Sequence, residues 1–346
     1  MDETTLLLNM LSKFSPTGKT KELAGYLVEV SRGLGFTSRI DGNGNFLAKK
    51  GQGEPTVLLL GHMDTVEGEV PVKKKGTVIF GRGAVDAKGP LCAMILAASG
   101  ARIKKGSVIV AGTCDEEGAS LGAQALTLSL SPDYVIVGEP SGWNGITLGY
   151  KGCAKLIYTV SSQNRHIAGK GKTACDQALD FYNLLIQRCG SGGEKKEGEP
   201  NFDSLSASIV SISTSQEDGT IKCSMKIDLR TPPGYKEKEL HGMLNGIKGE
   251  GEAVISGFVP NVAFPKNTPL ARAFVKSIRG RGGKPVFKRK TGTSDMNVVA
   301  QQWDVPMVTY GPGDSKYDHT PMEQIDIREL RKGIEVLTAV IEQLAV

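Results

Sequence analysis

A histidine and an aspartate follow an apolar run of strand length in the first fifth of the chain. Val57 to Leu60 are four consecutive aliphatic residues between Pro55 and Gly61, and "GHMDT" then places His62 and Asp64. Such a run is typical of a strand buried on both faces of a parallel sheet, and ligands of open α/β sheets bind beyond the carboxyl ends of the strands. Asp64 would then support a metal-bound His62. Alone, the triplet is more often an ordinary loop with a hydrogen-bonded histidine.

The same design recurs, and it places more acids and a second histidine after apolar strands. Asp86 lies between a glycine-rich loop and an apolar helix, a position where a carboxylate also serves as a helix cap. Neighbouring acids at a strand end are electrostatically costly unless cations neutralise them. The strands and the residues after them are Val108–Ala111 with Asp115, Glu116 and Glu117, Val135–Val137 with Glu139, and Val305–Tyr310 with His319.

Two histidines and three carboxylates from these positions are sufficient to hold two divalent cations. One bridging carboxylate, with one histidine and one further carboxylate for each ion, leaves room for a shared water and makes the site nearly neutral. Glu116 then has no ligand duty and is available as a general base. The candidate ligands are His62, Asp86, Glu117, Glu139 and His319. These ligand types suit zinc, while cobalt or manganese can occupy the same set.

Composition places the chain among ordinary globular proteins. The 346 residues are long enough for two domains or for one domain with an insert, and the hydrophobic content of 39% supports a sizeable core. We expect a cytoplasmic protein, because no secretory signal and no run of transmembrane length is visible. The spacing of the six cysteines indicates neither a zinc ribbon nor a disulfide framework, and we expect most of them to be buried thiols. Aromatic residues make up only 6%, and no nucleic-acid motif is present, so neither nucleic acid nor a membrane is an expected partner.

The elements around these residues predict an α/β catalytic domain interrupted by an insert. Helical spacing of apolar residues predicts a helix over 19–34 and a closing helix in the last 20 residues of the chain. Between residues 150 and 261 the pattern changes to β-α-β-β-α-β, the order of a ferredoxin-like domain. We therefore expect a catalytic domain over 1–149 and 262–346, with a mixed, largely parallel sheet covered by helices on both faces, and an inserted α+β domain over 150–261.

Five motifs in order resemble a known family, the co-catalytic zinc aminoacylases, carboxypeptidases and deacetylases that include acetylornithine deacetylase and succinyl-diaminopimelate desuccinylase. The motifs are "GHMDT", "GRGAVDAKGP", "DEEG", "GEPS" and "DHTP", and they span nearly the whole chain. The resemblance implies that Asp86 bridges the two ions. It assigns His62 and Glu139 to one ion and Glu117 and His319 to the other. It also implies that Asp64 orients the site and that Glu116 is the general base.

The insert resembles the dimerisation domain of that family, which is called the lid. The resemblance implies a homodimer formed through this domain. "RHIAGKGKTACDQAL" is similar to a lid segment whose histidine reaches the partner subunit's site, which implies that His166 stabilises the oxyanion. "KIDLRTPPG" implies that Arg230 binds a substrate carboxylate, with an internal salt bridge as an equal alternative. "RKTGTSDMN" is similar to a substrate loop, and the alternative there is a helix cap formed by Ser294 or Asp295. The implied substrate-binding residues are Arg230, Arg289, Thr291, Gly292, Thr293 and Ser294.

More narrowly, "KTGTSDMNVVAQQW" and "TYGPGDSKYDHTP" resemble the branch that releases lysine or ornithine from a small amino-group carrier protein in lysine and arginine biosynthesis. In that branch the scissile bond joins the γ-carboxyl of the carrier's terminal glutamate to the amine of the product. The carrier is acidic, in agreement with the lysines of 284–290 and the net charge of +5. The alternatives are an N-acetylornithine or N-succinyl-diaminopimelate deacylase and, in another class, a non-catalytic metal-dependent binding scaffold. Sequence does not decide between lysine and ornithine.

Overall fold

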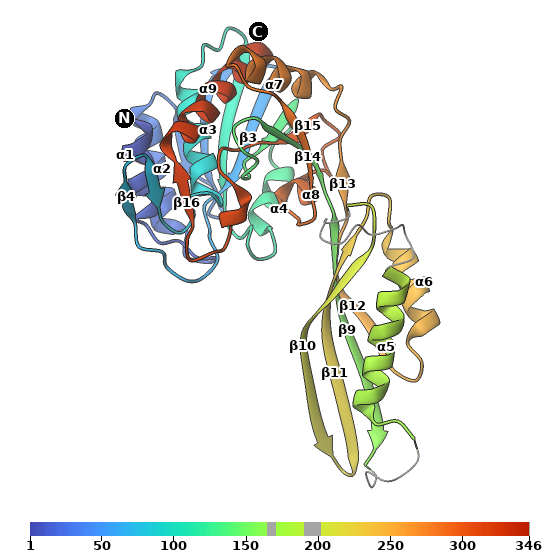
Figure 1. Ribbon diagram of the computed structural model, residues 1–346. Coiled ribbons are helices and arrows are strands. Elements are labelled where there is room, and N and C mark those ends of the chain that lie inside the picture. Colours follow the sequence, from blue (N-terminus) through green and yellow to red (C-terminus); the bar gives the residue numbers. More distant parts are fainter. Residues whose placement is uncertain (165–170, 190–201, 346) are drawn as a thin grey trace. The chain divides into compact units, whose positions relative to one another are not determined.

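The computed structural model describes residues 1–164, 171–189 and 202–345 (Figure 1). The described chain divides into two compact units. Unit 1 comprises Met1–Gly149, Phe264–Arg289 and Ser294–Val346, and unit 2 comprises Tyr150–Ala263 and Lys290–Thr293. None of the described helices is both long enough and apolar enough to cross a bilayer. Each of the six cysteines is a free thiol.

Unit 1 is built on a mixed sheet in which strands run in the order β1-β2-β6-β3-β7-β15-β8, with β14 also paired to β8. Its centre is parallel, because β3 pairs in parallel with β6 and β7, and β15 pairs in parallel with β7. A smaller sheet has the order β16-β5-β4. The strands are β1 (Thr37–Ile40), β2 (Phe46–Gln52), β3 (Thr56–His62), β4 (Lys73–Lys75), β5 (Val78–Phe80), β6 (Gly106–Thr113), β7 (Tyr134–Val137), β8 (Gly145–Tyr150), β14 (Val286–Lys290), β15 (Met307–Thr309) and β16 (Gln324–Asp326).

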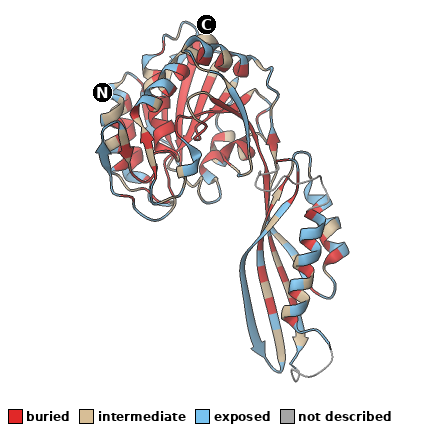
Figure 2. Ribbon diagram, viewed as in Figure 1, coloured by how far each residue is buried: buried red, intermediate tan, exposed pale blue. Residues whose placement is uncertain are grey.

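The central strands are buried on both faces, as the continuous apolar runs predict. Val57 and Leu59 belong to the main hydrophobic cluster, whereas Leu58 and Leu60 point to the opposite face and are equally buried. Figure 2 shows this burial along the parallel strands. The helices of unit 1 are α1 (Glu3–Leu11), α2 (Lys21–Gly33), α3 (Lys88–Gly100), α4 (Leu121–Thr127), α7 (Pro269–Gly280), α8 (Asp295–Val299) and α9 (Ile327–Leu344), with a 3₁₀ turn η1 (Ser315–Tyr317).

Unit 2 has the predicted β-α-β-β-α-β order. Its antiparallel sheet runs β10-β11-β9-β12, which is the strand arrangement of a ferredoxin-like fold. One face of the sheet packs on the helices, where the rings of Tyr158 and Phe181 stack at 3.8 Å. The edge strand β10 is exposed along almost its whole length (Figure 2). The elements are β9 (Gly152–Gln163), α5 (Ala174–Cys189), β10 (Ser206–Glu217), β11 (Thr220–Thr231), α6 (Glu237–Ile247), β12 (Glu252–Val259) and β13 (Val262–Ala263).

The expected fold class is thus confirmed: a mixed, largely parallel sheet with helices, and an additional α+β unit. The parallel arrangement matters for function because β3, β6 and β7 all end at the same edge of the sheet. His62 is the last residue of β3, the acids 115–117 come after β6, and Glu139 comes after β7. The fold therefore collects in one place residues that lie far apart in the sequence.

Candidate metal centre

Asp86 lies between the two histidines of unit 1. Its Oδ1 is 3.1 Å from Nε2 of His62, and its Oδ2 is 3.0 Å from Nε2 of His319. Each oxygen of one carboxylate thus faces a different imidazole. This is the arrangement required of a carboxylate that bridges two ions.

Each histidine has one further carboxylate as a neighbour. Glu139 Oε1 is 3.6 Å from Nε2 of His62, and Glu117 Oε1 is 3.0 Å from Nε2 of His319. Two groups of three potential ligands result, and within each group the ligand atoms lie within 4.8 Å of one another. The groups are His62, Asp86 and Glu139, and Asp86, Glu117 and His319. The five residues expected as ligands therefore lie together around a shared aspartate.

The two histidines are held very differently. The side chain of His62 is 1% exposed, lies at the end of a strand paired on both sides, and directs Nδ1 to the main-chain oxygen of Asp64 at 2.9 Å. That bond fixes which imidazole nitrogen is free for a metal. The side chain of His319 is 51% exposed, and its φ of 59° lies in the left-handed region. His319 belongs to a loop, so its position depends on other contacts.

The carboxylate of Asp64 binds the acidic loop more closely than it binds the imidazole. Its Oδ1 lies 3.6 Å from Nδ1 of His62. In contrast, Oδ1 accepts a hydrogen bond from the main-chain N–H of Glu116 and Oδ2 accepts one from that of Glu117, both at 3.1 Å. The hydroxyl of Thr17 donates a third hydrogen bond at 2.9 Å. Asp64 therefore fixes the loop after β6, which carries both a candidate ligand and the candidate base.

The electrostatics of the centre show an excess of negative charge. Burial alone would lower the pKa of His62, but hydrogen bonds to Asp64 and Asp86 outweigh it and hold this pKa well above its usual value. Hydrogen bonds to Asp86 and Glu117 raise the pKa of His319 to about 10. Burial would raise the pKa of Asp86, yet its contacts with both imidazoles hold the pKa below the usual range. Protons on the imidazoles thus supply the positive charge that the carboxylates need.

Glu116 is the acid whose protonation is most favoured by its surroundings. Burial raises its pKa well above the usual value; the charge of His62 opposes this shift, and the charges of Glu139, Asp295 and Asp86 reinforce it. Such a carboxyl accepts a proton readily, which is the property required of a general base that later acts as an acid. Asp295, in turn, is buried and accepts a hydrogen bond from the Thr113 hydroxyl at 2.9 Å.

The donor set fits divalent cations. Besides Glu116, the cluster holds the four carboxylates of Asp64, Asp86, Glu117 and Glu139, and two imidazolium groups can neutralise only two of them. Two divalent ions would supply four positive charges and would use imidazole and carboxylate ligands of the kind that zinc prefers. The excess charge of the metal-free cluster is therefore the structural reason to expect cations in it.

The residues expected to bind substrate are placed less tightly. In unit 2, Nη1 of Arg230 donates to the hydroxyl of Thr293 at 3.4 Å, and Thr291 and Gly292 belong to the same segment. Arg289 is exposed on β14. Ser294 in unit 1 caps α8, because its hydroxyl accepts from the N–H of Met296. His166 lies outside the described residues.

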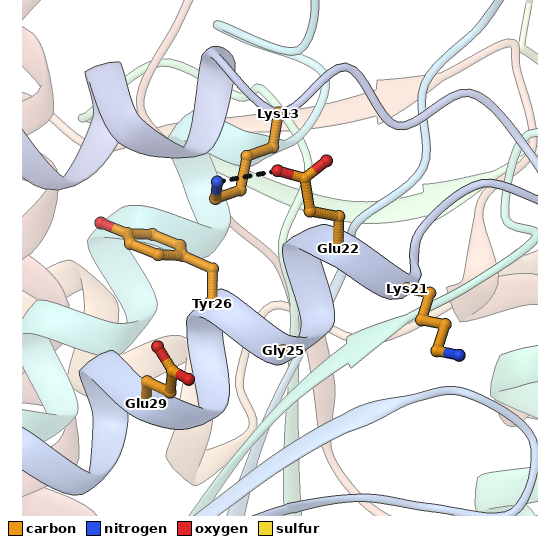
Figure 3. A pocket seen from close by; sticks show the side chains of 6 residues that line it. All are labelled: Lys13, Lys21, Glu22, Gly25, Tyr26 and Glu29. Carbon is orange, nitrogen blue, oxygen red and sulfur yellow. Dashed lines mark hydrogen bonds and ion pairs between the residues drawn. The ribbon is translucent and has the colours of Figure 1, made fainter.

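A hollow elsewhere on unit 1 differs chemically from this centre (Figure 3). It has a volume of about 630 Å³ and lies along α2. Two of its charged groups pair with each other, since Lys13 lies 3.0 Å from Glu22, and Lys13 also lies 5.2 Å from the centre of the Tyr26 ring. It contains no histidine and no cluster of acids. Among the described residues, both groups of potential metal ligands lie at the sheet edge and not in this hollow.

Sequence reasoning missed several residues that hold the ligands. Thr17 bonds Asp64, and Glu323 accepts from the main-chain N–H of Asp86 at 3.1 Å. Glu323 comes four residues after His319 in the stretch "DHTPME", so only its closeness to a candidate ligand could have marked it. Thr17 carried no comparable signal, because its contact is with a residue 47 positions away.

The chain is similar in sequence and in fold to known proteins. Residues 58–343 match the model of peptidase family M20/M25/M40. The chain is 38% identical to a [LysW]-lysine hydrolase of Deinococcus radiodurans over 98% of this chain and 96% of that protein. It is 32% identical to a [LysW]-lysine/[LysW]-ornithine hydrolase of Saccharolobus islandicus, over 98% and 95% of the two chains. The fold is also that of the M20 family metallo-carboxypeptidase Sso-CP2 from Sulfolobus solfataricus, with a TM-score of 0.78, 20% identity and coverage of 100% and 99%.

The pKa shifts predict that ion binding releases protons. At pH 7 the imidazole of His319, with a pKa of about 10, carries a proton that a metal ion must displace. The apparent affinity for Zn²⁺ should therefore rise with pH between 6 and 8, by about tenfold per pH unit for each proton released. Calorimetric titration in two buffers of different ionisation enthalpy measures both the affinity for Zn²⁺ and the number of protons released.

A matched histidine provides the control for this measurement. His241 is exposed on α6 in unit 2 and lies 3.9 Å from Glu237. The variant His241→Gln should release the same number of protons as the unmodified chain, whereas His319→Gln should release fewer. An affinity that is independent of pH, with no proton release, would contradict the assignment of His319 as a ligand.

Proposed function

Because the chain belongs to peptidase family M20/M25/M40, we propose that it is a dinuclear metal-dependent hydrolase that releases lysine or ornithine from an amino-group carrier protein. The bond cleaved is the amide between the γ-carboxyl of the carrier's C-terminal glutamate and the amine of the product. The observation that carries the chemistry is the Asp86 carboxylate, whose two oxygens face His62 and His319. The substrate class rests on the relatives named for LysW-linked lysine and ornithine.

In this proposal the two ligand groups hold one ion each and share Asp86. His62 and Glu139 complete the first group, and Glu117 and His319 complete the second. We propose zinc as the ion, and cobalt or manganese suits the same ligands. When bound, the ions supply Lewis-acid chemistry that polarises an amide carbonyl and acidifies water.

Glu116 performs the proton transfers in this proposal. It lies next to Glu117 in sequence, and its main-chain N–H is held by Asp64, so its side chain stays beside the ligand cluster. Its raised pKa suits it to take a proton from the attacking water and to return that proton to the leaving amine. The sum of the two transfers is hydrolysis of one amide bond to a carboxylate and an amine.

The carboxylates of the substrate are the groups to be recognised in this proposal. The residues proposed to bind them are Arg230, Arg289 and the segment 291–294. The contact between Arg230 and Thr293 supports a shared role for these two residues. The lysines of 284–290 offer positive charge to an acidic carrier. A homodimer formed through unit 2, the contribution of His166 from the partner subunit, and a cytoplasmic location stay predictions.

The variant Glu116→Gln tests the general base. Glutamine has nearly the same shape and keeps the main-chain bond to Asp64, so fold and ion binding should be retained. The rate constant kcat should fall by about 100-fold to 10,000-fold, because a positioned acid or base contributes about this much. Metal content and thermal melting serve as controls. Turnover close to that of the unmodified protein would remove Glu116 from this role.

The substrate is tested by parallel incubations. Carrier proteins charged with lysine or with ornithine are compared with N-acetylornithine and N-succinyl-diaminopimelate, and mass spectrometry follows the loss of each adduct. We expect the highest kcat/KM for a carrier adduct, and the ratio between the two adducts measures the preference between lysine and ornithine. Faster cleavage of either small acyl substrate would replace the carrier by a deacylase function, whereas metal binding without any cleavage would indicate a binding scaffold.

A further inference from the structure

Glu323 is a buried acid that belongs to neither ligand group and transfers no proton in the proposed reaction. Its side chain is only 1% exposed, although it lies four residues after the half-exposed His319. Its main-chain oxygen accepts from the N–H of Gly81 at 3.2 Å, which extends the pairing of β16 with β5 by one residue. The backbone around Glu323 is therefore fixed by a sheet, and its side chain turns toward the loop that carries Asp86.

One carboxylate oxygen of Glu323 holds the backbone of that loop. Oε1 accepts hydrogen bonds from the N–H groups of Val85 and Asp86, both at 3.1 Å. A buried N–H without a partner is energetically costly, so these two bonds favour the conformation observed for the loop. One of these N–H groups belongs to Asp86 itself, so the bond restrains the backbone from which the Asp86 side chain extends. Its direction toward the two histidines thus depends on Glu323.

The other oxygen forms a buried ion pair. Oε2 of Glu323 accepts from Nη1 of Arg82 at 2.8 Å, and both side chains are buried. Arg82 also donates to the main-chain oxygen of Thr320 at 3.3 Å and to that of Gly68 at 2.8 Å. Thr320 is the residue after His319. The pair therefore ties the segment 319–323 to the segment 82–86, across about 240 positions of sequence.

We propose that Glu323, with Arg82, is a positioning residue that keeps Asp86 and His319 at the spacing required by the second ion. The inference rests on the proposed dinuclear function and adds a residue to it. The first ion depends on it less, because His62 ends a strand that is paired on both sides and Glu139 comes after another central strand. His319, in contrast, belongs to a loop with a left-handed φ and an exposed side chain.

The experiment is a stepwise titration of metal-free protein with Co²⁺, followed by visible absorption, which gives a dissociation constant for each ion. In Glu323→Ala both main-chain N–H groups lose their acceptor and Arg82 loses its carboxylate partner. The second dissociation constant should rise by about 10-fold to 100-fold, the usual effect of removing a residue that supports a metal ligand. The first constant should change much less.

The conservative variant Glu323→Gln separates positioning from general stability. Its amide oxygen still accepts from the two N–H groups, but its NH₂ group faces the donors of Arg82. The second constant should rise by about fivefold, the equivalent of one hydrogen bond, and so lie between the unmodified chain and the alanine variant. Val340→Ala is the control for lost stability, because it creates a cavity on the buried face of α9. It should leave both dissociation constants unchanged.

Two results overturn the inference alone. The first is that both dissociation constants for Co²⁺ are unchanged in Glu323→Gln. The second is that the Glu323 variants lose affinity for both ions equally and that Val340→Ala loses the same affinity. If Glu323→Ala fails to fold, Glu323→Gln decides the question by itself. Unmodified protein that takes up fewer than two ions contradicts the proposed function and removes the inference with it.

Discussion

The repulsion between carboxylates gathered at one edge of the parallel sheet is the constraint on which the rest of the structure depends. Strands β3, β6 and β7 end there together, and the residues just after them bring in most of the acids. Asp86 lies between two imidazoles, and a positive charge on each of them stabilises its carboxylate in these surroundings. In the metal-free protein the imidazoles carry that charge as protons, and two cations would carry it in the dinuclear state.

The ligands are held in place by hydrogen bonds from the main chain to buried carboxylates. Asp64 accepts from two N–H groups of the acidic loop after β6, and Glu323 accepts from two N–H groups of the loop that carries Asp86. In both cases one side chain orients a loop whose own side chains face the centre. Hydrogen bonds within the chain thus restrict both loops, which reduces the conformational entropy that ion binding must overcome. These hydrogen bonds also explain how residues in loops beside the sheet can serve as ligands.

Much of this could be predicted from sequence, for reasons visible in particular residues. Val57 to Leu60 and Val108 to Ala111 are apolar without alternation, which indicates strands buried on both faces, and parallel strands of this kind bring the residues after them to one edge of the sheet. The meeting of His62, Asp86 and His319 was expected from that rule together with the family resemblance. The supporting contacts could not be predicted, because Thr17 and Glu323 act through main-chain N–H groups or distant side chains that leave no periodic pattern. Ser294 was open to two interpretations, and its capping bond became visible only with the backbone of α8.

The central claim is that the chain hydrolyses an amide bond when two ions are held by ligand groups that share Asp86. Its most direct test is the rate of lysine or ornithine release from the carrier adduct as Zn²⁺ is added to metal-free protein in measured equivalents. We predict no release without metal, a rate that rises until two ions per chain are bound, and no release from an Asp86→Ala chain at any metal concentration. Full turnover at zero equivalents, or in the Asp86→Ala chain, would contradict the claim.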